Sequence, residues 1–496
     1  MKLTDRVIGF LSTYAPRSRR IFRRRPSTRQ KSPMDNVPDE LLLHILHLAA
    51  NDHVNHPIAT SILSHVCSRW RMVALSNGIL WGRIVLTFPV SPHHLAYVVA
   101  CLERSGTYPL DIFLDFRDPA WNWVEDAHSF RWQEMEPIMR LFLVHVMRWR
   151  QFDLLADTWS PIFTFLWYTR HVKAAPALET LALSRCNLYL AAQGHSFHPV
   201  ALRQPLPFFG GILLPSLRSV SLIGVHIDWE QPSLRNLSEL QLKFHARDVM
   251  PTLSQFEAIF HSSPRLSHLA IFGWGPIFDN SRTIPNAGHL RLQYLQRLSF
   301  GFLDIPYSLQ LLSLFDFPSL SELVLEDISR VVNPGDLQDG SSFIQWLSST
   351  PSSLSSAIRP PNRLPMHQLR KLEIHNVRCS EPTFASFLRR LISLKRLGLF
   401  DVANDLLSLL IPQNDLEFLC PQLDELHCQD MDGEAVLTVV ASRSRAGPVS
   451  PMRNVVVEFV RQASPSPFSP LYTRLVDAGI EVHGRNGSES SGSQSS

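Results

Sequence analysis

The sequence predicts an α/β protein in which a small all-helical domain, residues 35–82, precedes a long solenoid of parallel strands with helical returns, residues 83–483. Three observations predict this fold class. Apolar residues near the start of the chain recur with a helical period. Further along, strand-like segments alternate with helix-like segments without hairpin signals, which favours parallel strands. From residue 178 onward an L-x-x-L-x-L motif recurs, which indicates a repeat protein.

The helical domain is predicted to contain two amphipathic helices. Asp35 and Asn36 are helix-capping types, Pro38 suits a first turn, and the two acidic residues after it complement the helix dipole. The apolar stripe of the first helix comprises Leu42, Ile45, Leu46 and Ala49, and that of the second comprises Leu63, Val66, Trp70 and Val73. Asn77 and Gly78 then provide a stop, and Leu80 and Trp81 end the unit. A unit this short buries little core alone, so it gains stability by docking onto a partner or onto the following domain.

The solenoid is predicted from strands and returns that repeat along the chain. Its first strands are expected at residues 83–87, 109–115 and 151–155, with helices at 93–104 and 134–147 between them. Copies of the L-x-x-L-x-L motif begin at Leu178, Leu217, Leu237, Leu266, Leu295, Leu320, Leu369, Leu394 and Leu423, and a degenerate copy surrounds Val455. The motif resembles a leucine-rich repeat, which implies short strands whose alternating apolar residues stack on neighbouring repeats. We therefore expect an irregular leucine-rich-repeat solenoid.

Three segments are expected to lie outside the repeats. Residues 1–34 form a basic tail and residues 484–496 a Gly- and Ser-rich tail, and both are predicted to be disordered. The Ser- and Pro-rich stretch 348–365 is predicted to be a surface loop, because Pro-Pro and clustered Ser neither pack nor pair well. This loop accounts for the wide gap before the repeat at Leu369.

Composition describes a folded chain with an uneven charge. Hydrophobic residues make up 45% and charged residues 18% of the chain. Residues 1–31 carry ten Lys or Arg and one Asp, a net charge of +9; since the whole chain has +3, the remainder has −6. An acidic body makes nucleic acid an unlikely partner for it. Six scattered cysteines without a C-x-x-C pair fit an intracellular protein, cytoplasmic or nuclear or both, and no apolar run is long enough to span a membrane.

Motifs for catalysis and for metal binding are missing from the sequence. There is no phosphate-binding loop, no G-x-S-x-G elbow and no H-E-x-x-H pair. One region is rich in possible zinc ligands, namely His44, His47, His53, His56, His65 and Cys67. These residues lack the compact four-ligand spacing of a structural zinc site, and partly packed or solvated histidines account for them better. We expect no catalytic residue, no metal and no cofactor.

Three blocks in the helical domain carry a family resemblance. They are residues 37–42 (Val-Pro-Asp-Glu-Leu-Leu), residues 66–71 (Val-Cys-Ser-Arg-Trp-Arg) and Leu80 with Trp81. Together they resemble an F-box, and the chain is similar to the divergent F-box proteins of mushroom-type fungi, in which a loose repeat array follows the box. The resemblance implies a non-enzymatic subunit that binds a Skp-type adaptor, and through it a cullin, in a ubiquitin ligase. The repeats would then select a protein substrate, which the sequence does not name.

The resemblance also implies which residues contact the adaptor or shape that contact. They are Val37, Pro38, Leu41, Leu42, Ile45, Leu46, Val66, Trp70, Leu80 and Trp81. Val37 stands where the family usually has Leu, and the stretch 53–56 between the helices is unusually polar. For Trp70 and Trp81, packing inside the domain is an equal alternative to direct contact. For the whole unit, the alternative is an ordinary helical hairpin that caps a larger fold.

Substrate-binding residues are expected on the strands of the repeats. In L-x-x-L-x-L the leucines point into the core, so the intervening side chains occupy the other face of the strands. The candidates are His268, Phe272, Arg297, Glu322, Lys371, His375, Arg396 and Phe400. We expect Phe272 and Phe400 to be exposed and to form a peptide-binding patch with His268 and Arg396. A solvated strand face is the alternative explanation for the charged residues.

Two other functions stay open at this point. A non-catalytic interaction scaffold without a ligase partner would have the same repeats. A nucleic-acid-binding protein would act through the basic tail, and salt-dependent binding that disappears on deletion of residues 1–31 would identify it.

The basic segment from Arg17 to Lys31 generates a first prediction. A solvated tail, a nuclear-import signal and a mitochondrial presequence are the three interpretations of its arginine block at residues 23–25. If the segment is an import signal, residues 1–34 fused to a fluorescent reporter will concentrate the reporter in nuclei, as fluorescence microscopy would show. A diffuse reporter would return the segment to a solvated tail, and a mitochondrial pattern would indicate a presequence.

Overall fold

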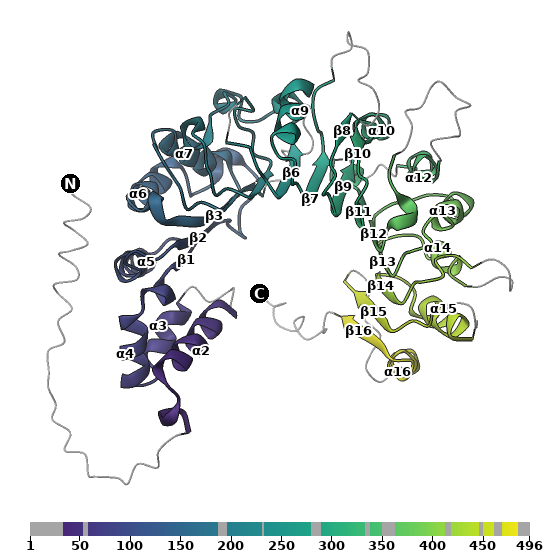
Figure 1. Ribbon diagram of the computed structural model, residues 1–496, viewed down its shortest axis with the longest axis horizontal. Helices are drawn as coiled ribbons and strands as arrows, with labels where there is room; N and C mark the ends of the chain where they lie inside the picture. The colour runs from purple at the N-terminus through teal and green to yellow at the C-terminus, as the bar shows by residue number, and fades with distance from the viewer. Residues whose placement is uncertain are drawn as a thin grey trace, which may run out of the picture. The chain divides into compact units, whose positions relative to one another are not determined.

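The computed structural model of the protein consists of two compact units (Figure 1). The first unit includes the residues up to Ala156 together with Ala175–Leu178, and the second includes Asp157–Ala174 and the chain from Glu179 onward. The structure describes residues 33–52, 58–186, 196–230, 233–278, 289–332, 338–349, 363–411, 418–445, 450–460 and 469–484. The predicted tails therefore lie outside the described residues, except for the residues at their inner ends.

The first unit begins with the helical domain. Its elements are η1 (Pro33–Asn36), α2 (Asp39–Asp52), α3 (Ala59–Ser64), α4 (Ser68–Ser76) and η2 (Gly78–Trp81). The structure has two helices, α3 and α4, where the sequence predicts one. The chain turns at residues 65–67, and Cys67 is the N-cap of α4. The two halves of the predicted apolar stripe therefore lie on different helices, and Val66 falls in the turn and is exposed.

Strands and helices alternate in the rest of the first unit as the sequence predicts. The elements are β1 (Arg83–Thr87), α5 (Pro92–Arg104), β2 (Leu110–Phe116), α6 (Trp132–Leu143) and β3 (Trp149–Ala156), with short turns η3 (Glu125–Ala127) and η4 (Val146–Arg148). The strands pair in parallel, β1 with β2 and β2 with β3. Helix α6 ends earlier than predicted, because the chain tightens into η4 after His145. The helical domain and these strands form one compact unit, so the domain boundary at residue 82 stays a prediction.

The second unit carries the leucine motifs on parallel strands. They are β4 (Thr180–Arg185), β5 (Ser219–Ile223), β6 (Glu239–His245), β7 (His268–Gly273), β9 (Arg297–Phe302), β11 (Glu322–Asp327), β12 (Lys371–His375), β13 (Arg396–Phe400), β14 (Glu425–Gln429), β15 (Asn454–Phe459) and β16 (Ile480–Gly484). They pair in this order, and β8 (Leu290–Arg291) pairs with β10 (Phe315–Asp316) beside them. Strand order follows chain order, so the predicted α/β fold with parallel strands and helical returns is confirmed.

Helical returns connect these strands, and several start at a side-chain cap. They are α7 (Trp159–Thr169), α9 (Leu253–His261), α10 (Ile305–Ser313), α11 (Ser329–Val332), α12 (Ser341–Ser348), α13 (Glu381–Leu388), α14 (Asp405–Ser408), α15 (Gly433–Arg445) and α16 (Pro470–Asp477), with short turns η5 (Val200–Leu202), η6 (Phe208–Gly211), η7 (Arg247–Val249) and η8 (Met366–Gln368). Thr252, Asp304 and Ser469 each accept a backbone N–H in the first turn of their helix. In Figure 1, α12 to α15 lie along one side of β12 to β15. Among the described residues no helix is long and apolar enough to cross a membrane.

The core of the second unit is built from leucines in register. At the first buried strand position the pairing sets these residues side by side: Leu240, Leu269, Leu298, Leu323, Leu372, Leu397 and Leu426. All of them are buried, whereas most of the residues between the buried positions are half-buried or exposed. Each strand therefore buries its apolar side chains chiefly against its neighbours, as in a repeat array.

The strands end at residues in the left-handed backbone region. Gly224, Gly273, Asn376, Asp401 and Asp430 have φ values between 52° and 89° at or directly after their strands, and Phe244 has the same conformation at a bulge in β6. Gly, Asn and Asp are the residues that tolerate this conformation, so the repeat includes a turn residue after its last apolar position. The predicted loop 348–365 overlaps the end of α12 at Ser348, and its residues 350–362 lie outside the described part of the chain.

The turn at Asn376 generates a second prediction. Asn376 has φ of 58°, and its backbone N–H donates to the Phe400 carbonyl at 2.9 Å. Asn376→Val will place a β-branched residue in this conformation at a cost of about 1–2 kcal/mol. Hydrogen exchange of the β12 and β13 amides should therefore become roughly 5- to 30-fold faster. Asn376→Gly is the matched control and should leave exchange near the natural rate; equal exchange in both variants would show that the turn carries no such constraint.

Candidate functional site

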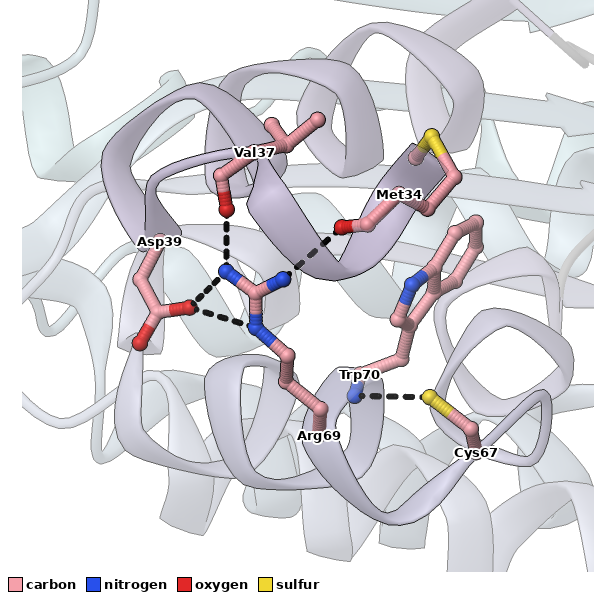
Figure 2. Close-up of polar contacts among 6 residues, drawn as sticks. All are labelled: Met34, Val37, Asp39, Cys67, Arg69 and Trp70. Carbon is pink, nitrogen blue, oxygen red and sulfur yellow. Dashed lines mark hydrogen bonds and ion pairs between the residues drawn. The ribbon is translucent and has the colours of Figure 1, made fainter. Parts of the chain in front are cut away.

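One side chain joins the start of the helical domain to its last helix. Arg69 of α4 donates two hydrogen bonds to Asp39 Oδ1, from Nη2 at 2.6 Å and from Nε at 2.9 Å (Figure 2). The same guanidinium donates to the Met34 carbonyl at 2.9 Å and to the Val37 carbonyl. Arg presents its N–H donors in a planar fork, so a single side chain can hold all three groups. Arg69 therefore fixes how the segment before α2 lies against α4.

Helix α4 begins at a sulfur cap. Cys67 has extended backbone torsions, and its Sγ accepts the Trp70 backbone N–H at 3.5 Å (Figure 2). Sulfur is a weak acceptor, so this cap contributes less than Ser or Asp would. The Cys67 thiol is exposed, whereas the Trp70 side chain is half-buried.

The end of the helical domain is packed and hydrogen-bonded. Trp81 is buried and its Nε1 donates to the Ala74 carbonyl at 2.7 Å, while Thr60 Oγ1 donates to the Leu80 carbonyl at 2.8 Å. The Arg104 guanidinium of α5 lies over the Trp81 ring, 4.4 Å from its centroid. Leu80 and Trp81 therefore tie α3 and α4 to the first repeat, which favours the packing alternative for Trp81.

Large apolar side chains are exposed on the same domain. Leu41 is 57% exposed, Ile45 41% and Val66 59%, although Ile45 and Val66 belong to the predicted apolar stripes. The other exposed apolar residues of the domain are Leu48, Ile58, Ile62, Met72, Leu75 and Ile79. So many exposed apolar side chains on a small domain are typical of surface that a partner covers, and Leu41, Ile45 and Leu48 share one side of α2 by their spacing. We call these nine residues the apolar face.

The structure divides the predicted adaptor-binding residues into three groups. Pro38, Leu41, Ile45 and Val66 are exposed, and Val37 and Trp70 are half-buried. Leu42, Leu46, Leu80 and Trp81 are buried in the domain, so they can shape a contact surface but not form it. The adaptor contact itself stays a prediction.

The predicted substrate-binding residues fall into two rows across the strands. His268, Arg297, Glu322, Lys371 and Arg396 are register partners on successive strands, and we call them the first row. Within it Arg297 pairs with Glu322 at 2.7 Å, and Arg396 pairs with Glu425 of the next strand at 2.8 Å. Lys371 instead pairs with Glu373 on its own strand at 2.8 Å. The basic residues of this row thus have acidic partners within the protein.

The remaining three candidates lie in a parallel row four residues further along each strand, and a second row, which includes Glu373, lies between the two. This third row runs from Phe272 through Gly301, Glu326 and His375 to Phe400. His375 stacks on Phe400 with ring centroids 4.2 Å apart and an interplanar angle of 2°. Contact with the His375 imidazole, and then the Lys371 ion pair, lower the pKa of Glu373, which lies between the two rows.

The expectation that Phe272 is exposed is wrong. Phe272 is only 7% exposed and packs against Ala270 and Ile328. The reason is Gly301 on the next strand, because a Cβ there would lie 2.5 Å from the Phe272 ring. The ring therefore lies across the glycine instead of standing out from the sheet.

The prediction that Phe272, Phe400, His268 and Arg396 form a single patch is also wrong. Strands β9, β11 and β12 separate β7 from β13, which puts the two phenylalanines roughly 19 Å apart at the spacing of neighbouring strands. Phe400 is half-buried between His375 and His427.

The described residues give little support to a catalytic or metal-binding site. Among the described residues no group of three or more His, Cys, Asp or Glu could hold a metal ion, and His53 and His56 lie outside them. Burial raises the pKa of Cys420 and Cys428 to about 12 and that of Cys101 to about 11. Thiols with such pKa values supply almost no thiolate at neutral pH.

Two features of the site were not found from the sequence. The Arg69 contacts join residues about 30 positions apart, and no periodic pattern marks them. Only Leu41, Ile45 and Val66 of the apolar face were named from the sequence, and its other six residues were missed. Apolar residues outside the predicted helical stripes, such as Leu48 and Met72, were a signal that could have identified them.

The helical domain matches a known family. A family model described as F-box-like matches residues 34–87, a stretch that contains the Arg69 contacts and the apolar face. No curated protein matches the chain. F-box domains generally bind Skp-type adaptors, and members of the family are typically non-enzymatic. The match supports an F-box protein and a role in adaptor binding.

Proposed function

We propose that the protein is the substrate-recognition subunit of a Skp–cullin–F-box ubiquitin ligase. The observation that carries the proposal is the apolar face on the F-box-like domain, in which Leu41, Ile45 and Val66 are exposed on a folded helical frame. An adaptor that covers these side chains would remove their apolar surface from water.

The repeats would hold the substrate in this assembly. Ubiquitin transfer would take place on other subunits, and this chain would supply proximity, which raises the effective concentration of substrate lysines near the charged ubiquitin carrier. The first and third rows offer charged and aromatic side chains for that purpose. We propose an intracellular location on the same basis.

The scaffold alternative differs in its partners. A scaffold would bring down neither adaptor nor cullin when it is purified from cells, whereas a ligase subunit would bring down both. The nucleic-acid alternative depends on the basic tail, which lies outside the described residues.

A third prediction tests the apolar face. Leu41→Ala combined with Ile45→Ala should weaken adaptor binding about thirty-fold, because exposed apolar anchors at an interface often contribute roughly 2 kcal/mol. Purified chain and adaptor, measured by calorimetry, would give the affinity. Ala retains helix propensity, so the helices should stay folded.

The matched control truncates an exposed leucine and an exposed isoleucine outside the F-box-like domain. Leu213 and Ile392 are exposed in the second unit, and Leu213→Ala with Ile392→Ala should leave the affinity unchanged. Leu42→Ala is unsuitable, since Leu42 is fully buried and its loss would cost roughly 2–5 kcal/mol of stability. Full affinity in a folded Leu41 and Ile45 variant would rule out the proposed face.

A fourth prediction concerns Arg69 as a positioning residue. Arg69→Lys removes the planar fork that holds the Met34 and Val37 carbonyls together with Asp39, and each lost hydrogen bond costs about 0.5–1.5 kcal/mol. We expect faster hydrogen exchange at the start of α2 and weaker adaptor binding. Arg71→Lys is the matched control, because Arg71 is exposed in the same helix. Unchanged exchange and affinity in the Arg69 variant would contradict this role.

A further inference from the structure

Strand β16 has an edge that no other described strand covers. It pairs in parallel with β15 and is the last strand of the sheet in the part of the chain that the structure describes (Figure 1). Every second residue of a strand directs its N–H and C=O groups to the same edge, so β16 presents hydrogen-bond donors and acceptors on the side away from β15. An edge of this kind can pair with another strand.

The core position of β16 is incompletely covered as well. Leu399, Cys428 and Val457 are register partners in one row of the core, and each is fully buried because the next strand packs against it. Val482 continues this row on β16 but is only half-buried. The repeat therefore ends on an apolar side chain that lacks the neighbour its predecessors have.

Helix α16, which leads into β16, exposes a second apolar side chain. Val476 is 49% exposed. A Cβ at Gly433 of α15 would lie 3.4 Å from Leu475, and Arg474 pairs with Glu434 of α15 at 2.6 Å. At about 100° per helical residue, Val476 is therefore on the side of α16 away from α15. The end of the unit thus combines an unpaired backbone edge with two incompletely covered valines.

The exposed side chains of β16 are complementary to those of a second copy. If two β16 strands lie antiparallel about a two-fold axis at Val482, Glu481 of each copy is opposite His483 of the other. In one chain these two side chains are on the same face of the strand, 3.8 Å apart. Pairing centred one residue earlier would set Glu481 opposite Glu481, and one residue later His483 opposite His483. The charges therefore favour the register centred on Val482.

We propose that the protein forms a homodimer in which the β16 strands of two copies pair antiparallel and join the two sheets. Backbone groups of both edges gain partners, and Val482 of each copy covers Val482 of the other. The two-fold axis is perpendicular to the sheet, so both α16 helices lie on one face of the joined sheet, where their Val476 side chains can meet. Charged residues on a short edge strand commonly prevent pairing; here they select one partner and one register.

Sedimentation of the full chain tests the oligomeric state. The natural chain should sediment as a dimer at micromolar concentration. His483→Glu sets a glutamate opposite Glu481 at two places in each dimer and should weaken dimerisation about tenfold or more. Glu481→Lys combined with His483→Glu restores opposite charges in the same register and should return the affinity to within about threefold. His367→Glu is the matched control, because His367 is exposed outside β16, and it should change nothing.

A disulfide at the two-fold axis tests the register independently. Val482→Cys places two thiols directly opposite each other, with Cα atoms about 5 Å apart, which a disulfide can bridge. His483→Cys places them on a diagonal at roughly 7–8 Å, where a disulfide forms poorly. Both changes are made together with Cys67→Ser, because Cys67 is exposed. After mild oxidation, a non-reducing gel should show a covalent dimer for the first variant and far less for the second.

Three results would overturn the inference. They are a chain that stays monomeric at every concentration, a dimer that His483→Glu does not weaken, and equal cross-linking by the two cysteine variants. A monomer that adds a strand of another protein at β16 would also contradict it. The measurements use the chain without adaptor, so the homodimer and the proposed ligase role can fail separately.

Discussion

The in-register pairing of parallel strands is the constraint on which the rest of the structure depends. Each strand of the repeats has only a few apolar side chains at its buried positions, such as Leu323 and Leu325 of β11, and these are buried because the same positions of the next strand lie against them. A shift of one residue would turn the leucines outward and the charges inward, so the register is strongly specified. The same pairing that builds the core arranges the remaining side chains into rows. The chemistry of the strand face is therefore a consequence of the core.

Those rows explain why most charges on the face are already satisfied. Residues at equal positions of neighbouring strands lie about 5 Å apart, so Arg297 and Glu322 meet across the sheet. Where the repeat has a glycine, the pattern changes. At Gly301 the Phe272 ring lies across the strand and is buried, instead of standing out from the sheet. Departures from the repeat, and not the repeat itself, give this surface its distinctive chemistry.

The sequence predicted what depends on short-range periodicity and missed what depends on register. Alternation of leucines identified the strands, because each motif carries its signal within six residues. The burial of Phe272 depends on Gly301, 29 positions later, and only the strand pairing brings the two together. Arg69 was missed for the same reason, since its contacts cross about 30 residues. Helix periodicity correctly identified Leu42 and Leu46 as buried. It also assigned Ile45 to the buried side of the helix, whereas Ile45 is exposed in the structure.

The F-box-like domain shows how a small unit can leave apolar residues exposed and still fold. Its buried set is short, and Trp81 adds to it by packing against α5 through Arg104 and by donating to Ala74. This support from the first repeat means that the domain does not need Leu41, Ile45 or Val66 in its own core. Exposed side chains of this size gain little from folding and promote association in water. Their presence on a frame already held by Arg69 and Trp81 is best explained by a surface that stays ready for a partner instead of one that closes on itself.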